Sequence, residues 1–147
     1  MELTVRYLGG TKFEAEARGH RVLCDQPRAN GGHDEGMTPP EFLLASLGTC
    51  AGYYAAQYLR TRSLTAGDLT VRVEAEKAAA PPRLASFRIE VSVPGLEERH
   101  VTGVLRAVKA CLIHNTLLAT PDIEVAVNPV TPAVSAGAPA AAREAVH

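Results

Sequence analysis

The chain has 147 residues, 46% of them hydrophobic, with 15 basic and 16 acidic side chains and a formal net charge of −1. This size and composition predict a single globular domain, and the balanced charge gives no support for binding nucleic acid or a membrane surface. The three cysteines are too few for a secreted scaffold built on disulfides.

Alternating apolar residues at the N-terminus predict three short strands. The first covers residues 3–7, Gly9 and Gly10 form a turn, and a partner strand continues over 13–17. A third strand is expected over 21–25. Because the opening MELTVRYLGG mixes acidic and basic residues and is typical of a strand, it is not a signal peptide. We therefore expect a cytoplasmic protein, in which a disulfide is transient and catalytic.

A central helix is predicted over residues 42–59, FLLASLGTCAGYYAAQYL, which carries no charge and is apolar or small on every face. Such a helix must be enclosed on all sides. A bilayer needs about 20 apolar residues, and this run is shorter and contains several polar ones, so a buried helix is favoured over a membrane span. Thr38 is the expected N-cap, Pro39 opens the helix, and Glu41 completes a capping box. That cap alone is a sufficient structural reason for Glu41.

The second half of the chain alternates again. Strands are predicted over 69–76 and 87–93, with a break at Pro81-Pro82. The segment 97–112 has apolar residues at positions i, i+3, i+4, i+7 and i+11, which predicts an amphipathic helix. Gly48 and Gly52 on the central helix are expected to let another backbone approach closely.

A short helical turn at Leu117-Leu118 and a last strand over 123–127 complete the predicted α+β fold, with antiparallel sheets around a long buried helix. We assign residues 1–128 to this domain and 129–147 to an Ala/Pro-rich tail. One sheet cannot wrap an all-apolar helix alone, so we expect a homodimer that sandwiches two such helices.

Cysteines are the main candidates for chemistry. Cys50 lies in the middle of the central helix and Cys111 at the end of the second helix, so a redox pair is conceivable. Burial in the core explains each of them equally well, and Cys24 is expected to be core. Zinc could be held by Cys111, His114 and Cys50, but a fourth ligand is missing. A Cys–His nucleophile pair lacks an acid to orient His114.

The segments GHRVLCDQP, GG, TPPEFLLASLGTC and KACLIHNTLL resemble the OsmC/Ohr family of osmotically inducible and organic-hydroperoxide-resistance proteins. The resemblance runs from about Gly19 to Val127. Its specific parts are the patterns P-E-x-L-L-A-x-x-x-x-C and C-x-x-H-x-T-L. It implies an intertwined α+β homodimer and a thiol peroxidase that reduces organic hydroperoxides without metal or flavin and is recycled by a dithiol.

The same resemblance assigns roles to individual residues. Cys50 would be the peroxidatic cysteine, Cys111 the resolving cysteine, and Glu41 the acid that positions an arginine at the thiolate. Arg28 is the preferred arginine, because it lies in the loop before the central helix. The alternatives, in order, are Arg18 and Arg21.

Two expectations follow for Cys50 from physical chemistry. A thiol in the middle of an apolar helix should have a raised pKa, so the mechanism requires a guanidinium nearby. Glu41 and Cys50 are nine residues apart, one fewer than in Ohr proteins, which separates them by about 13 Å on opposite sides of one straight helix. Glu41 should therefore act at the Cys50 of the other subunit.

Two other classes of function remain open. The first is a non-enzymatic protein of the same fold that binds an apolar or acyl ligand in the dimer pocket, with its thiols merely buried. The second is a structural or metal-binding dimer.

Overall fold

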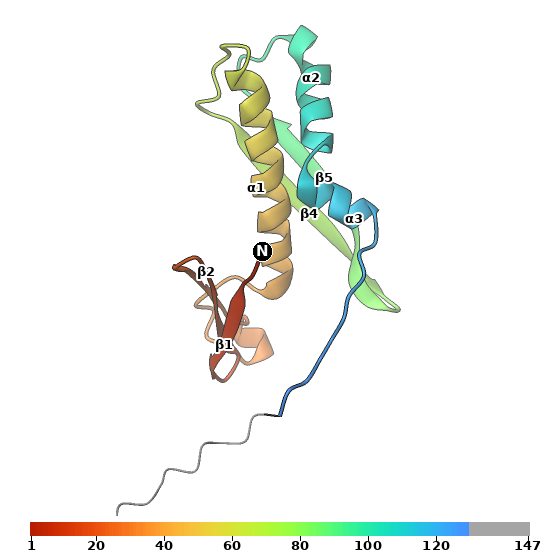
Figure 1. Ribbon diagram of the computed structural model, residues 1–147. Coiled ribbons are helices and arrows are strands. Elements are labelled where there is room, and N and C mark those ends of the chain that lie inside the picture. Colours follow the sequence, from red (N-terminus) through yellow and green to blue (C-terminus); the bar gives the residue numbers. More distant parts are fainter. Residues whose placement is uncertain (130–147) are drawn as a thin grey trace, which may run out of the picture.

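The computed structural model describes residues 1–129, so almost all of the predicted tail lies outside the described part. The elements along the chain are β1 (Thr4–Gly9), β2 (Lys12–Ala17), β3 (His20–Cys24), η1 (Arg28–Asn30), α1 (Pro39–Arg60), β4 (Thr70–Ala79), β5 (Pro82–Ser92), α2 (Glu98–Lys109) and α3 (Leu112–Leu118). They confirm the predicted α+β class. Both sheets are antiparallel, with the orders β1-β2-β3 and β4-β5 (Figure 1).

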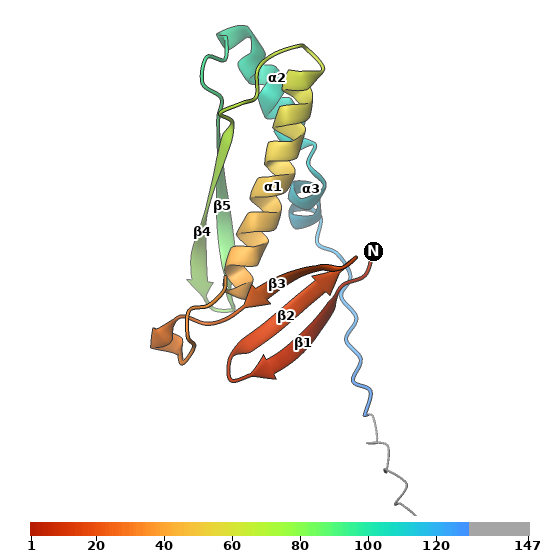
Figure 2. The ribbon, with the colours of Figure 1, turned by 90° about the vertical axis from the view of Figure 1, so that its left-hand side faces the viewer.

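The three-stranded sheet has one charged and one apolar face. Its charged face carries ion pairs that join Arg6 and Arg21 to Glu14 and Glu16. The strand register gathers these apolar residues on the opposite face: Val5, Tyr7, Phe13, Ala15 and Val22. Figure 2 shows this sheet beside the N-terminal end of α1, away from β4 and β5. Most of the large apolar side chains are exposed, Tyr7 to 65%, so this face has no cover within one chain.

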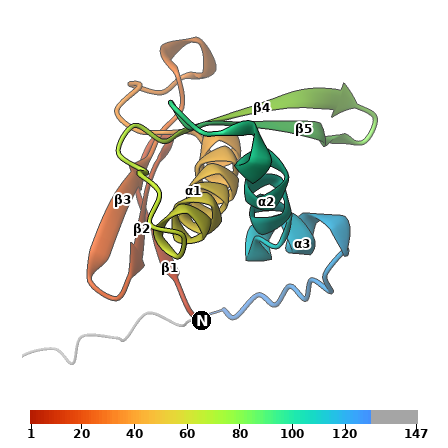
Figure 3. The same ribbon diagram turned by 90° about the horizontal axis from the view of Figure 1, so that it is seen from above.

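Helix α1 packs on the β4-β5 hairpin and on α2 (Figure 3). The core cluster consists of Ala51, Ala55, Leu59, Val104 and Val108. Side chains rather than a backbone approach the helical glycines: a Cβ on Gly48 would lie 3.0 Å from the Val73 side chain of β4, and one on Gly52 would lie 3.4 Å from the Val71 side chain. Within residues 1–129, no helix is both long and apolar enough to cross a membrane.

A single chain does not enclose the central helix on all sides, so the predicted enclosure depends on the expected homodimer and stays a prediction. The buried residues of this helix form one stripe, in which Leu47, Ala51, Ala55 and Leu59 follow one another at four-residue spacing. The Tyr53 side chain, on another face, is 57% exposed. The β4-β5 sheet, α2 and α3 together cover only part of this helix, and Tyr53 shares the exposed stripe with Ser46, Thr49 and Gln57.

The sequence prediction also fails near the C-terminus. Helix α2 ends at Lys109, so Cys111 is not on its apolar stripe but is the residue that precedes α3. The predicted strand over 123–127 is absent from the described chain. Ile123, Val125 and Val127 are more than 80% exposed. An alternating β-branched pattern forms a strand only where a ladder partner is available, and no strand within residues 1–129 pairs with this segment.

Candidate active site

The fold brings Cys50 and Cys111 together, as the redox-pair hypothesis requires. Cys50 lies midway along α1 and is half-buried, and Cys111 immediately precedes α3 and is fully buried. Helix α3 packs against α1, which places the two thiols beside one another. Both are free thiols.

The pKa of the Cys50 thiol is lowered, contrary to the sequence prediction. Burial acts to raise it, but the Cys111 side chain and the backbone N–H groups of Ile113 and Leu112 act in the opposite direction and prevail. The prediction considered only the mid-helix position of Cys50 on α1. The start of α3 supplies the stabilising N–H groups, and its position depends on tertiary packing.

The pKa of the Cys111 thiol shifts the other way. Burial raises it, and the neighbouring Cys50 thiol raises it further. The directions of the two shifts make Cys50 the more readily ionised thiol of the pair, and the thiolate is the nucleophilic form of cysteine. Cys111 remains protonated beside it. This asymmetry fits a nucleophile and a second thiol that reacts later.

Glu41 caps α1, as predicted. One of its carboxylate oxygens accepts hydrogen bonds from the backbone N–H of Thr38 at 2.7 Å and from the Thr38 hydroxyl at 2.8 Å. These bonds, with the positive charge of Lys77, hold the pKa of Glu41 below its usual value. Glu41 and Cys50 lie nine residues apart on the continuous helix α1. At 100° and 1.5 Å per residue, about 13 Å and opposite faces separate them, so Glu41 does not serve the Cys50 of its own chain.

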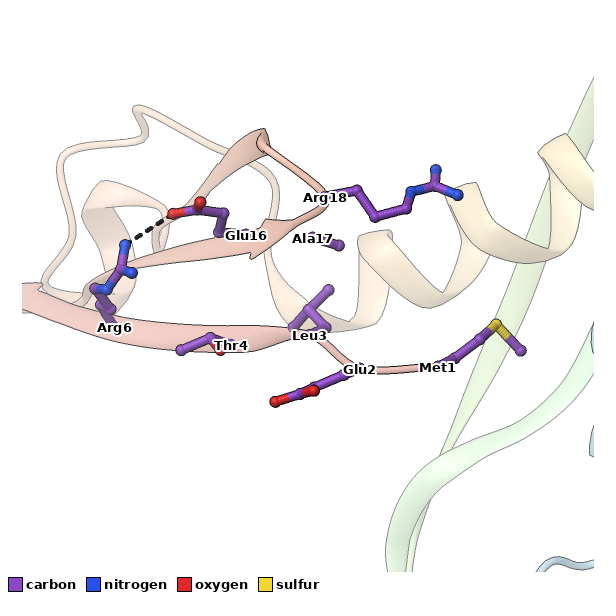
Figure 4. Close-up of a pocket in the computed structure, with 8 residues that line it drawn as sticks. All are labelled: Met1, Glu2, Leu3, Thr4, Arg6, Glu16, Ala17 and Arg18. Carbon is purple, nitrogen blue, oxygen red and sulfur yellow. Dashed lines mark hydrogen bonds and ion pairs between the residues drawn. The ribbon is translucent and has the colours of Figure 1, made fainter.

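The three candidate arginines lie in different places. Arg28 is exposed in η1, and Arg21 pairs with Glu16 at 3.3 Å. Arg18 occupies the β2-β3 turn with φ = 53° and lines a cavity of about 810 Å³ beside the N-terminus (Figure 4). Neither cysteine lines that cavity. Among the described residues, no arginine is one of the groups that shift the pKa of Cys50, so the assignment of Arg28 stays a prediction.

The His114 ring and Cys24 lie outside the thiol pair, although the backbone N–H of His114 acts to lower the pKa of Cys111. The ring Nδ1 of His114 lies 3.1 Å from the carbonyl oxygen of Lys109; since a carbonyl only accepts, Nδ1 carries the proton. Cys24 is buried at the end of β3. Within residues 1–129, no group of three or more His, Cys, Asp or Glu side chains could hold a metal ion.

Two features of the site region were not predicted from the sequence. One is the pair of N–H groups at the start of α3, which no sequence signal indicates. The other is Asp25, which is fully buried and accepts four hydrogen bonds around the loop before α1. An aspartate directly after a strand and before a glycine-rich segment is the signal that could have indicated it.

An apolar groove of about 440 Å³ lies between α1 and β4. Its lining includes Thr49, the residue before Cys50. It is lined by Leu44, Ala45, Gly48, Thr49, Gly52, Leu69, Val71 and Val73. Gly48 and Gly52 contribute no side chain to the α1 wall of this groove.

Comparisons with solved structures support the same fold. A Psychrobacter arcticus protein named for osmotic stress induction and detoxification response is 20% identical, with a TM-score of 0.72 over 78% of this chain and 85% of that chain. The OsmC-like protein from Mycoplasma pneumoniae is 19% identical, with a TM-score of 0.65 over 81% and 87% of the two chains. The organic hydroperoxide resistance protein OhrB of Bacillus subtilis is 16% identical, with a TM-score of 0.53 over 81% and 90%. Identities this low show the fold alone.

Sequence comparison gives the family. A search of curated proteins finds no significant match. The family model described as OsmC-like protein matches residues 32–126, which include α1, the strands β4 and β5, and both cysteines of the pair. Since that match spans well over half of the chain, the protein belongs to the OsmC-like family.

Proposed function

We propose that the protein is a thiol-dependent peroxidase that reduces organic hydroperoxides, with Cys50 as the peroxidatic and Cys111 as the resolving cysteine. The observation that carries the proposal is the contact between the two thiols, with a lowered pKa at Cys50 and a raised pKa at Cys111. Membership in the OsmC-like family supports it, since the fold is shared with organic hydroperoxide resistance proteins.

The reaction has three balanced steps. The Cys50 thiolate attacks the distal peroxide oxygen, the O–O bond breaks, and the alkoxide leaves as an alcohol after taking a proton, which leaves Cys50 as a sulfenic acid. Cys111 then attacks the Cys50 sulfur, water leaves, and a disulfide forms. A dithiol from a reducing cytoplasm reopens that disulfide by exchange and is itself oxidised.

A homodimer completes the site in this proposal. The apolar face of the β1-β2-β3 sheet and the uncovered side of α1 are the surfaces that a second copy would bury. Exposed apolar patches of this kind mark association sites. Two copies of α1 would then lie between sheets, which suits the uncharged run over residues 42–59.

Glu41 and Arg28 would act across this dimer. Each chain holds Glu41 far from its own Cys50, so a carboxylate that helps to place a guanidinium at a thiolate must do so in the other subunit. Arg28 is exposed in the loop that leads into α1 and is therefore accessible to a second copy. The pKa of Cys50 is already lowered within one chain. Arg28 of the second copy would lower it further and would also stabilise the transition-state charge on the peroxide.

Stopped-flow measurement of thiol loss with cumene hydroperoxide and dithiothreitol tests the proposal. Cys50→Ser should abolish turnover, and Cys111→Ser should consume about one equivalent of peroxide and then stop at the sulfenic acid. Cys24→Ser is the matched control and should keep the wild-type rate. Full turnover by the Cys50→Ser variant would rule the mechanism out.

The apolar groove between α1 and β4 favours a second candidate, a protein that binds an apolar or acyl ligand without catalysis. In that case a fatty acid would bind and the cysteine variants would bind it equally well. Absence of any thiol loss with cumene hydroperoxide, together with such binding, would favour this second candidate.

A further inference from the structure

A buried carboxylate organises the loop before α1. Asp25 follows β3 and has no exposed surface. Its Oδ1 accepts hydrogen bonds from the Thr11 hydroxyl at 2.6 Å and the Gln26 N–H at 2.8 Å. Its Oδ2 accepts from the N–H groups of His33 at 3.0 Å and Glu35 at 3.2 Å. Four donors replace the water that a buried charge loses, so the carboxylate is satisfied without a cation.

The loop over residues 26–36 has little freedom to take another path. A Cβ on Gly32 would collide with the backbone of Gln26, and one on Gly36 with the backbone of Leu23. The N–H groups at positions 33 and 35 both point at the same carboxylate oxygen of Asp25. The loop therefore closes around Asp25, and its shape depends on that group.

Arg28 is part of this closed loop. Its carbonyl accepts a hydrogen bond from the Gly31 N–H at 3.1 Å, and Asn30 bonds back to Pro27 at 2.9 Å. The backbone of Arg28 is thus fixed by the loop, while its side chain is exposed. A change in the shape of the loop would redirect the guanidinium.

We propose that Asp25 is a positioning residue, which holds the loop over 26–36 in the shape that directs Arg28 to the Cys50 site of a second copy of the chain. This inference rests on the proposed function. The role needs a carboxylate, because Asn would offer one acceptor oxygen and turn an NH₂ group toward N–H donors that need acceptors.

The test compares Asp25→Asn with Asp34→Asn as the matched control. Asp34 belongs to the same loop, is exposed, and has φ = 63°, which asparagine tolerates. Two readouts at Cys50 are followed: the rate of oxidation by cumene hydroperoxide and the pH profile of alkylation by monobromobimane. We expect Asp25→Asn to slow oxidation about ten- to a hundredfold, as misplacement of a catalytic group does. It should also raise the alkylation pKa by about one unit. Asp34→Asn should change neither.

Arg28→Ala decides whether Asp25 acts through the arginine. In the Arg28→Ala background, Asp25→Asn should change the oxidation rate and the alkylation pKa of Cys50 little further, because both substitutions remove the same placement of the guanidinium. An equal loss of the Cys50 oxidation rate in both backgrounds, or no loss of that rate on Asp25→Asn, overturns the inference. If Asp25→Asn fails to fold, Thr11→Val removes one donor and should give a smaller effect with the same dependence on Arg28. If wild-type Cys50 resists the peroxide, the proposed function fails, and the alkylation profiles still decide the role of Asp25.

Discussion

At the residue scale, the two thiols differ in burial and in the groups that face them. Cys50 receives the N–H groups of Leu112 and Ile113, and Cys111 is deeper and lies against an ionisable neighbour. Neither cysteine needs a nearby guanidinium for this difference. The contact between the two thiols lowers the pKa of Cys50 and raises that of Cys111, whereas the N–H groups at the start of α3 act to lower both.

The first prediction concerns Cys111→Ala. Because the Cys111 side chain helps to lower the pKa of Cys50, its removal should raise that pKa. Only the thiolate reacts, so alkylation of Cys50 should then require a higher pH than in the wild type. The pH profile of monobromobimane labelling, read by mass spectrometry on the Cys50 peptide, measures the shift. Cys24→Ala is the control, and an unchanged Cys50 profile in Cys111→Ala would show that the thiols do not interact.

At the scale of elements, α1 and α2 are held together where a glycine meets an aromatic ring. The Tyr58 ring lies against Gly103 of α2, and its hydroxyl lies 3.3 Å from Nδ1 of His100. The Arg62 guanidinium stacks on the Tyr58 ring, with its Cζ 3.8 Å from the ring centroid. Gly103 is therefore present for the close contact, although glycine is a poor helix former.

Gly103→Ala should consequently destabilise the protein. Alanine gains about 1 kcal/mol of helix propensity, but its Cβ would overlap the Tyr58 ring. Overpacking of this kind costs about 1–3 kcal/mol, and displacement of the ring would also weaken its contacts with His100 and Arg62. Thr102→Ala, on the exposed side of the same helix, should be neutral or stabilising. Urea unfolding measures both, and a more stable Gly103→Ala variant would contradict this interpretation.

The sequence predicts elements well where the signal is local. The cap at Thr38 and Glu41 and the alternation of β4 depend on neighbouring residues, and both are confirmed. The position of Cys111 was misjudged because the apolar period continues past Lys109 while the helix ends there. The pKa of Cys50 depends on α3, which is distant in the sequence. Period and spacing carry no information about such contacts.

At the scale of the whole molecule, one chain leaves too much apolar surface uncovered. The apolar face of the β1-β2-β3 sheet is exposed, and so are Tyr53 of α1 and the leucines Leu112, Leu117 and Leu118 of α3. Burial of such surface is favourable by about 25 cal/mol per Å². The described chain is consistent with half of an assembly.

Tyr7→Glu should therefore weaken self-association. The substitution puts a charge on the apolar sheet face, where Tyr7 is 65% exposed in one chain. Thr4→Glu adds the same charge on the opposite face and is the matched control. Light scattering should give twice the chain mass of 15.6 kDa for the wild type and for Thr4→Glu. A Tyr7→Glu protein that remains as dimeric as its control would exclude this face as the interface.

A shared site predicts recovery of activity in mixed dimers. A Glu41→Ala subunit retains Cys50, and a Cys50→Ser subunit retains Glu41, so a heterodimer should contain one working site. Each homodimer should be inactive although folded. Peroxide consumption by purified heterodimers measures the recovery, and its absence would mean that Glu41 only caps α1 or that the site is not shared.

The central claim is that Cys50 and Cys111 form a catalytic redox pair. Peptide mapping under non-reducing conditions, after one equivalent of cumene hydroperoxide, tests it most directly. The account predicts one disulfide between the Cys50 and Cys111 peptides, with Cys24 still a free thiol, and full reversal by dithiothreitol. Recovery of all three cysteines as unmodified thiols, or oxidation spread equally over them, would contradict it.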